Sequence, residues 1–300
     1  MIVCTPEVRD ALSSGIPVVA LESTVYSNLG LPSPANAEAL EACVSAIRGH
    51  GAVPAITAVL DGEIRAGLTD SEYERILGAA TKTAERDIPV AVAKRWKVGA
   101  TTVSASLAIA AAVGIQVFVT GGIGGVHRGV EESGDVSADL AAIARHPVAT
   151  ISAGAKSFLD LPRTLEALDT LGVPVVGWET DVLPAFTARE TAFELPHRFD
   201  DLGELAALVA AQRGFGRGLL IANPVPAEHA LDQAVHDAAL QRALDDADAD
   251  GVSGAAVTPF VLERIAQASD GQSVPANVAL VANNAALGAE LGQRLVSSSG

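Results

Sequence analysis

The chain has 300 residues, of which 49% are hydrophobic and 19% are charged, and its formal net charge is −16 at pH 7. A field of this sign repels nucleic-acid backbones and anionic membranes, so we expect neither as a partner. The length suits one large domain, and no internal stretch rich in proline, glycine and serine divides it. We therefore predict a single domain over residues 1–300.

The cysteines and the most apolar segments bear on the cellular compartment. Cys4 and Cys43 lack the spacing of a zinc site, and two reduced thiols are typical of a cytoplasmic protein. The first fifteen residues carry charges and no long apolar core, so they do not read as a signal peptide. Polar residues interrupt the apolar run 105–120, which predicts a helix ending near Gly114 and then a strand. We expect a cytoplasmic protein.

The N-terminal half alternates short apolar strands with alanine-rich helices. The predicted elements are a strand over 17–24, a helix over 33–51, a strand pair over 53–68 with a turn at 61–62, and a helix over 69–80. Ser33 or Asn36 is expected to cap the first helix, and Thr69 or Asp70 to begin the second.

The same alternation continues to the end of the chain. The further predicted elements are a helix within 99–114 entered through a small-residue loop, strand 116–120, loop 121–129, helix 135–146, strand 148–153, helix 164–172, strand 173–178, helix 202–213, strand 218–226, and helices 229–249 and 277–296. Strands that alternate with helices in this way predict an α/β fold with a mostly parallel sheet. Ligands of such folds bind at the carboxyl ends of the strands, so the loops there are the first candidates for a site.

One such loop, Thr120–Gly129, reads TGGIGGVHRG. Its four glycines before His127 permit close backbone approach to a ligand and positive φ angles. The loop matches neither a P-loop nor a dinucleotide-binding fingerprint. We interpret it as a ligand or metal loop, with a tight structural turn as the alternative.

Two carboxylates follow that loop. Asp135 and Asp139 are four residues apart, so we expect one face of the predicted helix to present both. Carboxylates together with water suit Mg²⁺ or Mn²⁺. Ser137 adds a hydroxyl and exposed amides that can seat a phosphate at the start of a helix. The alternative is a capping Asp135 and a solvated Asp139.

Two other segments have features of an active site. Glu22 ends an apolar strand, and a partly desolvated carboxyl there has a raised pKa and can act as a general acid or base. A salt-bridged glutamate is the alternative. Thr101 and Thr102 offer hydroxyls and free amides where a helix begins, which suits either an anion site or simple capping.

Lys156 stands in the segment SAGAKS, behind a predicted strand. The chain has four lysines among its 20 basic residues, so arginine is its usual cation. A lysine among small residues can lose its proton on desolvation and attack a carbonyl, whereas an arginine stays charged. These properties predict a Schiff-base lysine.

Several strings occur in order along residues 20–284, namely ALEST, PAITAVLDG, GATTVSAS, VFVTGGIGGVHRG, DVSADL, SAGAKSFLDLPRTLEALDTLGVPVVGW, LIANPVP, TPFVL and NVALVANN. Together they resemble the pseudouridine-5′-phosphate glycosidases, the indigoidine synthase A-like family. The resemblance implies a three-layer α/β/α sandwich around a mostly parallel, mixed sheet. It also implies a homotrimer that reversibly cleaves the C–C glycosidic bond of pseudouridine 5′-phosphate to uracil and ribose 5-phosphate.

The resemblance also implies residue roles. Lys156 would form a Schiff base with C1′ of the ring-opened ribose, Glu22 would donate a proton, and Asp135 would hold one Mn²⁺, or another divalent cation, per subunit through water. The positions implied in substrate binding are Lys82, Val103, Ser137, Ala138, Asp139 and Asn277, and the amides of 101–103, Thr102 included, would help to seat the phosphate. We add the hypothesis that Asp139 is the base for ring opening.

The sequence departs from the family pattern in two segments. Residues 26–36 read YSNLGLPSPAN, without the family's histidine, and 82–87 read KTAERD, with Glu85 in place of an arginine. Other functions therefore stay open. They are a Schiff-base lyase or aldolase, a C-glycosidase for a different pentose phosphate or C-nucleotide, and a non-catalytic protein that binds a sugar phosphate or a nucleotide.

Overall fold

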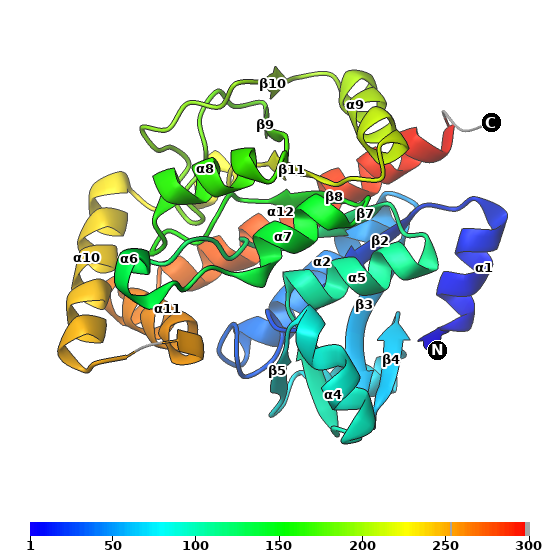
Figure 1. Ribbon diagram of the computed structural model, residues 1–300, viewed down its shortest axis with the longest axis horizontal. Helices are drawn as coiled ribbons and strands as arrows, with labels where there is room; N and C mark the ends of the chain where they lie inside the picture. The colour runs from blue at the N-terminus through cyan, green and yellow to red at the C-terminus, as the bar shows by residue number, and fades with distance from the viewer. Residues whose placement is uncertain (253, 298–300) are drawn as a thin grey trace.

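The computed structural model describes residues 1–252 and 254–297, which form three layers with a sheet between two layers of helices (Figure 1). The sheet order is β1 (Ile2–Cys4), β4 (Glu63–Ala66), β3 (Val53–Leu60), β2 (Val18–Leu21), β7 (Val117–Val119), β8 (Ala149–Ser152), β11 (Leu219–Ala222), β9 (Val175–Trp178) and β10 (Arg198–Phe199). Neighbours from β3 to β10 are parallel, and β4 is antiparallel to β3. The predicted α/β class and mixed, mostly parallel sheet are confirmed.

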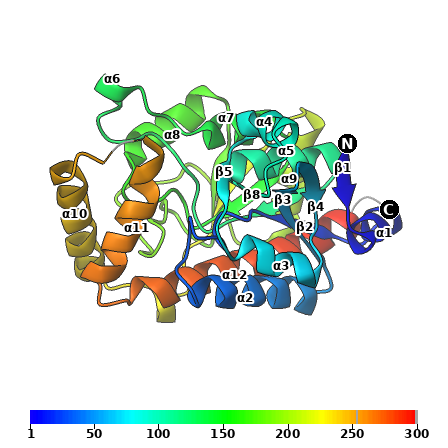
Figure 2. The same ribbon diagram turned by 90° about the horizontal axis from the view of Figure 1, so that it is seen from below.

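Helices cover both faces of the sheet (Figure 2). One face carries α1 (Pro6–Ser14), α5 (Val103–Val113), α7 (Ala138–Arg145) and α8 (Leu161–Thr170), and the other carries α2 (Ala35–Gly49), α9 (Leu202–Gly214) and α12 (Ser273–Ser297). In β2, Val18 and Ala20 pack into one apolar cluster, and Val19 and Leu21 into the other. Successive side chains of a strand point to opposite faces, so a sheet buried on both faces needs an uninterrupted apolar run.

Smaller elements complete the architecture. These are α3 (Asp70–Ile76), β5 (Thr81–Thr83), α4 (Ile88–Ala93), β6 (Val98–Thr101), α6 (Val130–Ser133), α10 (Gln233–Ala249), α11 (Val257–Ala268) and short 3₁₀ turns at 85–87, 227–229 and 254–256. Helices α10 and α11 pack against each other at one end of the molecule (Figure 2). Every helix of the described ranges is too short or too polar to cross a membrane.

Three local predictions need correction. Residues 99–101 belong to β6, which pairs with the end of β3, and are not a loop. Asn36 does not cap α2, and neither does Ser33, because Pro34 holds the cap position. The side-chain amide of Asn36 instead donates to the carbonyls of Tyr26 at 2.9 Å and Leu77 at 3.2 Å, which ties the 26–36 segment to the fold.

The helix predicted over 135–146 begins later than expected. Its first residue is Ala138, and the Ser137 hydroxyl caps it by accepting from the Asp139 N–H at 3.2 Å. Asp135 lies in the preceding segment, after Gly134 in the left-handed conformation at φ 64°. Asp135 and Asp139 therefore do not share a helix face. Thr69, in contrast, precedes the first residue of α3 as one of the two predicted starts. The Glu72 carboxylate accepts from its N–H at 2.8 Å and from its hydroxyl at 2.9 Å.

Candidate active site

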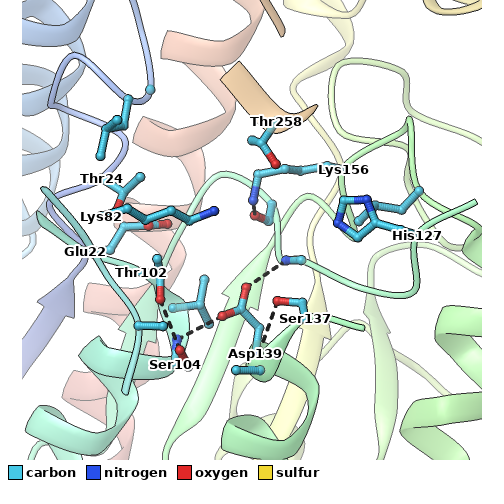
Figure 3. Close-up of a pocket in the computed structure, with 18 of the residues that line it drawn as sticks. Glu22, Thr24, Lys82, Thr102, Ser104, His127, Ser137, Asp139, Lys156 and Thr258 are labelled. Atoms are coloured by element: carbon cyan, nitrogen blue, oxygen red, sulfur yellow. Dashed lines mark hydrogen bonds between the residues drawn. The ribbon is translucent and has the colours of Figure 1, made fainter. Parts of the chain in front are cut away.

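A cavity of about 760 Å³ opens where β2, β7 and β8 end. These strands are parallel neighbours, so the residues that follow them meet at one edge of the sheet. The structure brings every predicted site residue to the lining of this cavity, namely Glu22, Lys82, Thr102, Val103, Asp135, Ser137, Ala138, Asp139, Lys156 and Asn277. Figure 3 shows Glu22, Lys82, Asp139 and Lys156 arranged around the same space.

Glu22 follows β2 and is 5% exposed. The Thr120 hydroxyl donates a hydrogen bond to its carboxyl. Burial raises the pKa of Glu22 to about 7, against the opposing effects of the Lys156 charge and the Thr120 hydrogen bond. A carboxyl with this pKa carries a proton near neutral pH and can donate it within the cavity.

Two buried asparagine side chains hold Thr120, the hydrogen-bond partner of Glu22, in place. The carbonyl of Thr120 accepts a hydrogen bond of 2.7 Å from the side-chain amide of Asn284, which is fully buried. The Asn284 side-chain oxygen in turn accepts one of 2.9 Å from Asn223. The strings NPVP and NVALVANN contained these asparagines, but sequence reasoning gave Thr120, Asn223 and Asn284 no role.

Lys156 follows β8, and its Nζ donates a hydrogen bond of 2.7 Å to the carbonyl of Gly122 in the loop after β7. Desolvation lowers the pKa of Lys156, while the charges of Glu22 and Asp139 act in the opposite direction. A lowered pKa increases the fraction of neutral amine, which is the nucleophilic form. The predicted environment for an amine nucleophile is therefore present.

Asp139 is 6% exposed and is not the solvated residue that the alternative interpretation supposed. One carboxylate oxygen accepts from the Ser104 N–H at 3.0 Å and the other from the Gly124 N–H at 2.9 Å. The side chain thus joins the start of α5 to the glycine loop (Figure 3). A Cβ at Gly124 would lie 2.4 Å from the Ser137 hydroxyl oxygen, so this close approach requires glycine.

The glycines of the loop approach protein side chains closely, and they do not adopt the predicted positive φ. None of the four glycines before His127 has a positive φ, and Gly129, at the end of the loop, has φ 71°. Gly122 is also packed tightly, because a Cβ there would lie 2.7 Å from a ring carbon of Phe186. Small size, and not backbone conformation, explains the glycines at the cavity wall.

Asp135 lies 4.0 Å from His127, measured between Oδ2 and Nδ1, and both residues line the cavity. Within the described ranges, no three His, Cys, Asp or Glu side chains form a cluster that could hold a metal ion. A single carboxylate fits a hard cation that keeps most of its water, as Mg²⁺ and Mn²⁺ do, and not a fully dehydrated zinc cage. The donor set is compatible with the expected water-mediated contact.

The positive charge of the cavity comes from lysine and from helix N-termini. Lys82 on β5 points into the cavity near Thr102, which precedes α5, and Ser137, which precedes α7 (Figure 3). The first N–H groups of a helix lack partners within it and favour anions. The free amides predicted at Thr101 and Thr102 are not present, because their N–H groups donate to the Ser23 hydroxyl at 2.9 Å and to the Thr83 carbonyl at 3.0 Å. This arrangement suits a phosphate group despite the net charge of −16.

Glu85, the departure in the KTAERD segment, does not face this cavity. Its carboxylate contacts His146 at 3.1 Å and forms an ion pair with Arg145 at the end of α7. The next residue, Arg86, lines the cavity. The substitution therefore adds no negative charge to the wall of the site.

Several lining residues were not predicted. They are Thr24, Ser104, His127, Phe186 and Thr258, among others. Thr258 comes from α11 and lies near Lys156 (Figure 3). The string TPFVL contains this threonine, and only the tertiary contact of α11 with the cavity reveals its position.

Comparisons with known proteins identify the family of the chain. The model of a family described as indigoidine synthase A-like protein matches residues 7–294. The pseudouridine-5′-phosphate glycosidase of Methylobacterium nodulans is 50% identical over 95% of this chain and 86% of its own length. That of Herpetosiphon aurantiacus is 48% identical over 99% of both chains.

Two solved structures share the fold over nearly the whole chain. The prealnumycin C-glycosynthase AlnA in complex with ribulose 5-phosphate is 37% identical, with a TM-score of 0.91, and the match covers 100% of this chain and 98% of that one. An indigoidine synthase A-like protein from Thermotoga maritima is 33% identical, with a TM-score of 0.88 and coverage of 99% and 97%.

Proposed function

Because the chain belongs to the indigoidine synthase A-like family, we propose that it reversibly cleaves the C–C glycosidic bond of pseudouridine 5′-phosphate, giving uracil and ribose 5-phosphate. One observation carries the proposal. An amine of lowered pKa, Lys156, and a carboxyl with a pKa of about 7, Glu22, line the same cavity as Lys82 and two helix N-termini. The first pair suits imine chemistry, and the remainder suits a sugar phosphate.

The proposed cleavage uses both members of that pair. Nζ of Lys156 bonds to C1′ as the bond from C1′ to the ring oxygen breaks, and the proton that Nζ gives up passes to that oxygen, by way of Asp139 in our hypothesis. The nitrogen lone pair then forms a C=N bond and expels carbon 5 of uracil, which takes its proton from Glu22. Water hydrolyses the imine, which releases ribose 5-phosphate and restores the amine. A carboxylate pair of the ordinary glycosidase kind does not supply this route, because the scissile bond has no heteroatom to protonate.

The other predicted residues bind and position the substrate in this proposal. Lys82, Ser137 and the Val103 N–H at the start of α5 would seat the phosphate, since the N–H groups of Thr101, Thr102 and Ser104 already have partners. Asn277 would contact the base. Asp135 would hold one Mn²⁺ or similar cation per subunit through water. When bound, the cation supplies positive charge beside the substrate oxygens. The family resemblance is also the support for a homotrimer and for a cytoplasmic location.

The function is tested by incubating the protein with pseudouridine 5′-phosphate and Mn²⁺. We expect uracil and ribose 5-phosphate in equal amounts, and no reaction of uridine 5′-phosphate, whose base is bonded through nitrogen. If uracil is not released although borohydride traps ribose 5-phosphate on Lys156, the imine chemistry stands and the aglycone is another one. If neither is seen with a folded protein, the proposal is wrong.

Replacing Asp139 by Asn should lower the rate of ring opening about 100-fold, because the carboxylate is the proposed base. The amide can accept only one of the two backbone hydrogen bonds, so we also expect a loss of about 1–3 kcal/mol in unfolding free energy. The rate of borohydride trapping measures the first effect and thermal unfolding the second.

A substrate without a sugar ring shows whether Asp139 acts as the base for ring opening or only positions its neighbours. Glycolaldehyde phosphate already has a free aldehyde, so its trapping on Lys156 should be nearly unchanged in Asp139→Asn. Equal slowing of glycolaldehyde phosphate and ribose 5-phosphate would show that Asp139 only positions the loop and α5.

Replacing Thr120 by Val should raise the pKa of Glu22 further, because the hydroxyl stabilises the charged carboxylate. The pH above which turnover declines should move upward, and turnover at neutral pH should fall about tenfold as the carboxyl loses its fixed orientation. A pH profile of kcat measures both effects. Thr120→Ser retains the hydroxyl and should restore the original profile, and identical profiles for Val, Ser and the unmodified protein would contradict the assignment.

A further inference from the structure

A second cavity, of about 480 Å³, adjoins the first. It lies between the segment 28–36, helix α11 and the start of α12. Five residues line both cavities, namely Gly30, Leu31, Phe186, Leu262 and Asn277. The two spaces therefore share part of their walls.

The second cavity differs chemically from the first. No lysine, arginine or histidine of the described residues lines it, and Glu263 is the one charged side chain found there. Apolar groups such as Leu31, Pro32 and Ile265 alternate with side-chain amides such as Asn36 and Gln267. This lining disfavours a phosphate and suits a neutral planar group, and the volume is within the roughly 300–1,000 Å³ of small-molecule sites.

Phe186 stands at the boundary between the cavities in a strained conformation. Its φ is 63°, a value that phenylalanine seldom adopts, and its N–H donates to the Ala153 carbonyl at 2.9 Å. The ring occupies the space beside Gly122, the residue whose carbonyl accepts the hydrogen bond from Lys156. The aromatic wall of the second cavity is thus fixed next to the proposed nucleophile.

The segment 28–36 supplies another part of the wall of the second cavity. Asn28, Gly30, Leu31, Pro32 and Ser33 all line the second cavity. Asn36 fixes this segment through its two hydrogen bonds to backbone carbonyls. The segment is therefore held in place as a wall of the second cavity.

We propose that the second cavity is an aglycone subsite, which receives a neutral aromatic substituent on the base while the ribose 5-phosphate remains in the first cavity. This inference rests on the proposed function and extends its substrate class. The chemistry is unchanged in the synthetic direction. Carbon 5 of the substituted uracil bonds to C1′ of the imine and gives its proton to Glu22, and closure of the ribose ring then releases Lys156.

The test uses ribose 5-phosphate with uracil, 1-benzyluracil or 3-benzyluracil, and detects the C-nucleotide by mass. We expect at least one benzyl isomer to react with kcat/KM within tenfold of that of uracil. Ala266→Phe alters a position that lines only the second cavity, and it should lower kcat/KM at least tenfold for that isomer and less than twofold for uracil.

Two further variants control this experiment. Ala238→Phe adds the same ring on the exposed side of α10 and should change neither reaction. Gln267→Trp fills the second cavity from an exposed position, and it replaces Ala266→Phe in the test if that variant does not fold. Turnover of uracil alone, or a benzyl rate that neither cavity variant lowers, overturns the subsite. Failure of all three bases refutes the proposed function, and the subsite with it.

Discussion

The Lys156→Arg protein should neither cleave pseudouridine 5′-phosphate nor form a borohydride adduct with ribose 5-phosphate. Arginine keeps the positive charge near Glu22 but does not lose its proton in proteins, so no neutral nitrogen is available to attack C1′. Loss of a covalent nucleophile lowers turnover on the order of 10⁴-fold or more. The measurement is the intact mass after borohydride treatment, followed by identification of the labelled peptide.

Lys82→Arg is the matched control for this experiment. Lys82 lines the same cavity, and an arginine there keeps the cation that we propose for the phosphate. We expect weaker binding of ribose 5-phosphate but a normal adduct on Lys156. An adduct that persists in Lys156→Arg and disappears in Lys82→Arg would identify Lys82 as the nucleophile.

The fold was predictable from the sequence because its strands are buried on both faces. Such strands give short apolar runs, like Val18–Leu21, bounded by helices with clear ends. Several predicted site residues also meet in one cavity, because they lie in the segments that follow the carboxyl ends of parallel strands. Glu22 and Lys156 could therefore be placed together from their positions after β2 and β8.

The relation between Asp135 and Asp139 could not be predicted in the same way. A spacing of four residues implies a shared face only when both residues lie in one helix. The helix begins after its cap at Ser137, so Asp135 lies outside it. The contacts of Asp139 join it to Ser104 and Gly124, which are 35 and 15 residues away. Sequence periodicity carries no information on such contacts.

The second cavity has no counterpart in the sequence pattern either. Its walls come from the segment 28–36, from Phe186 and from α11, which are far apart in the chain. The positive φ of Phe186 runs against the preference of a bulky residue, so surrounding contacts must impose it. Features of this kind depend on tertiary structure and are visible only there.

Replacing Glu22 by Gln should lower turnover of pseudouridine 5′-phosphate about 1,000-fold, because the amide cannot give a proton to carbon 5 of uracil. The imine does not need that proton, so borohydride should still trap ribose 5-phosphate on Lys156. In the unmodified protein, turnover should decline as the pH rises above about 7, where Glu22 loses its proton. Cleavage by Glu22→Gln at the normal rate would show that another group is the acid.

Stability gives an independent measurement of the same carboxyl. The pKa of Glu22 is raised from an ordinary value of 4.5 to about 7 in the folded protein, so folding favours the protonated form. Its contribution to stability is complete below about 4.5 and is lost as the pH rises through about 7. Gln does not titrate, so the Glu22→Gln protein does not lose this contribution. The difference in unfolding free energy between Glu22→Gln and the unmodified protein should therefore shift by up to about 3 kcal/mol in favour of the variant from pH 4 to pH 8. Denaturant unfolding at these two pH values measures the difference. Parallel stability curves would show that the pKa of Glu22 is the same in the folded and unfolded protein, so that Glu22 is charged at neutral pH and is not the acid.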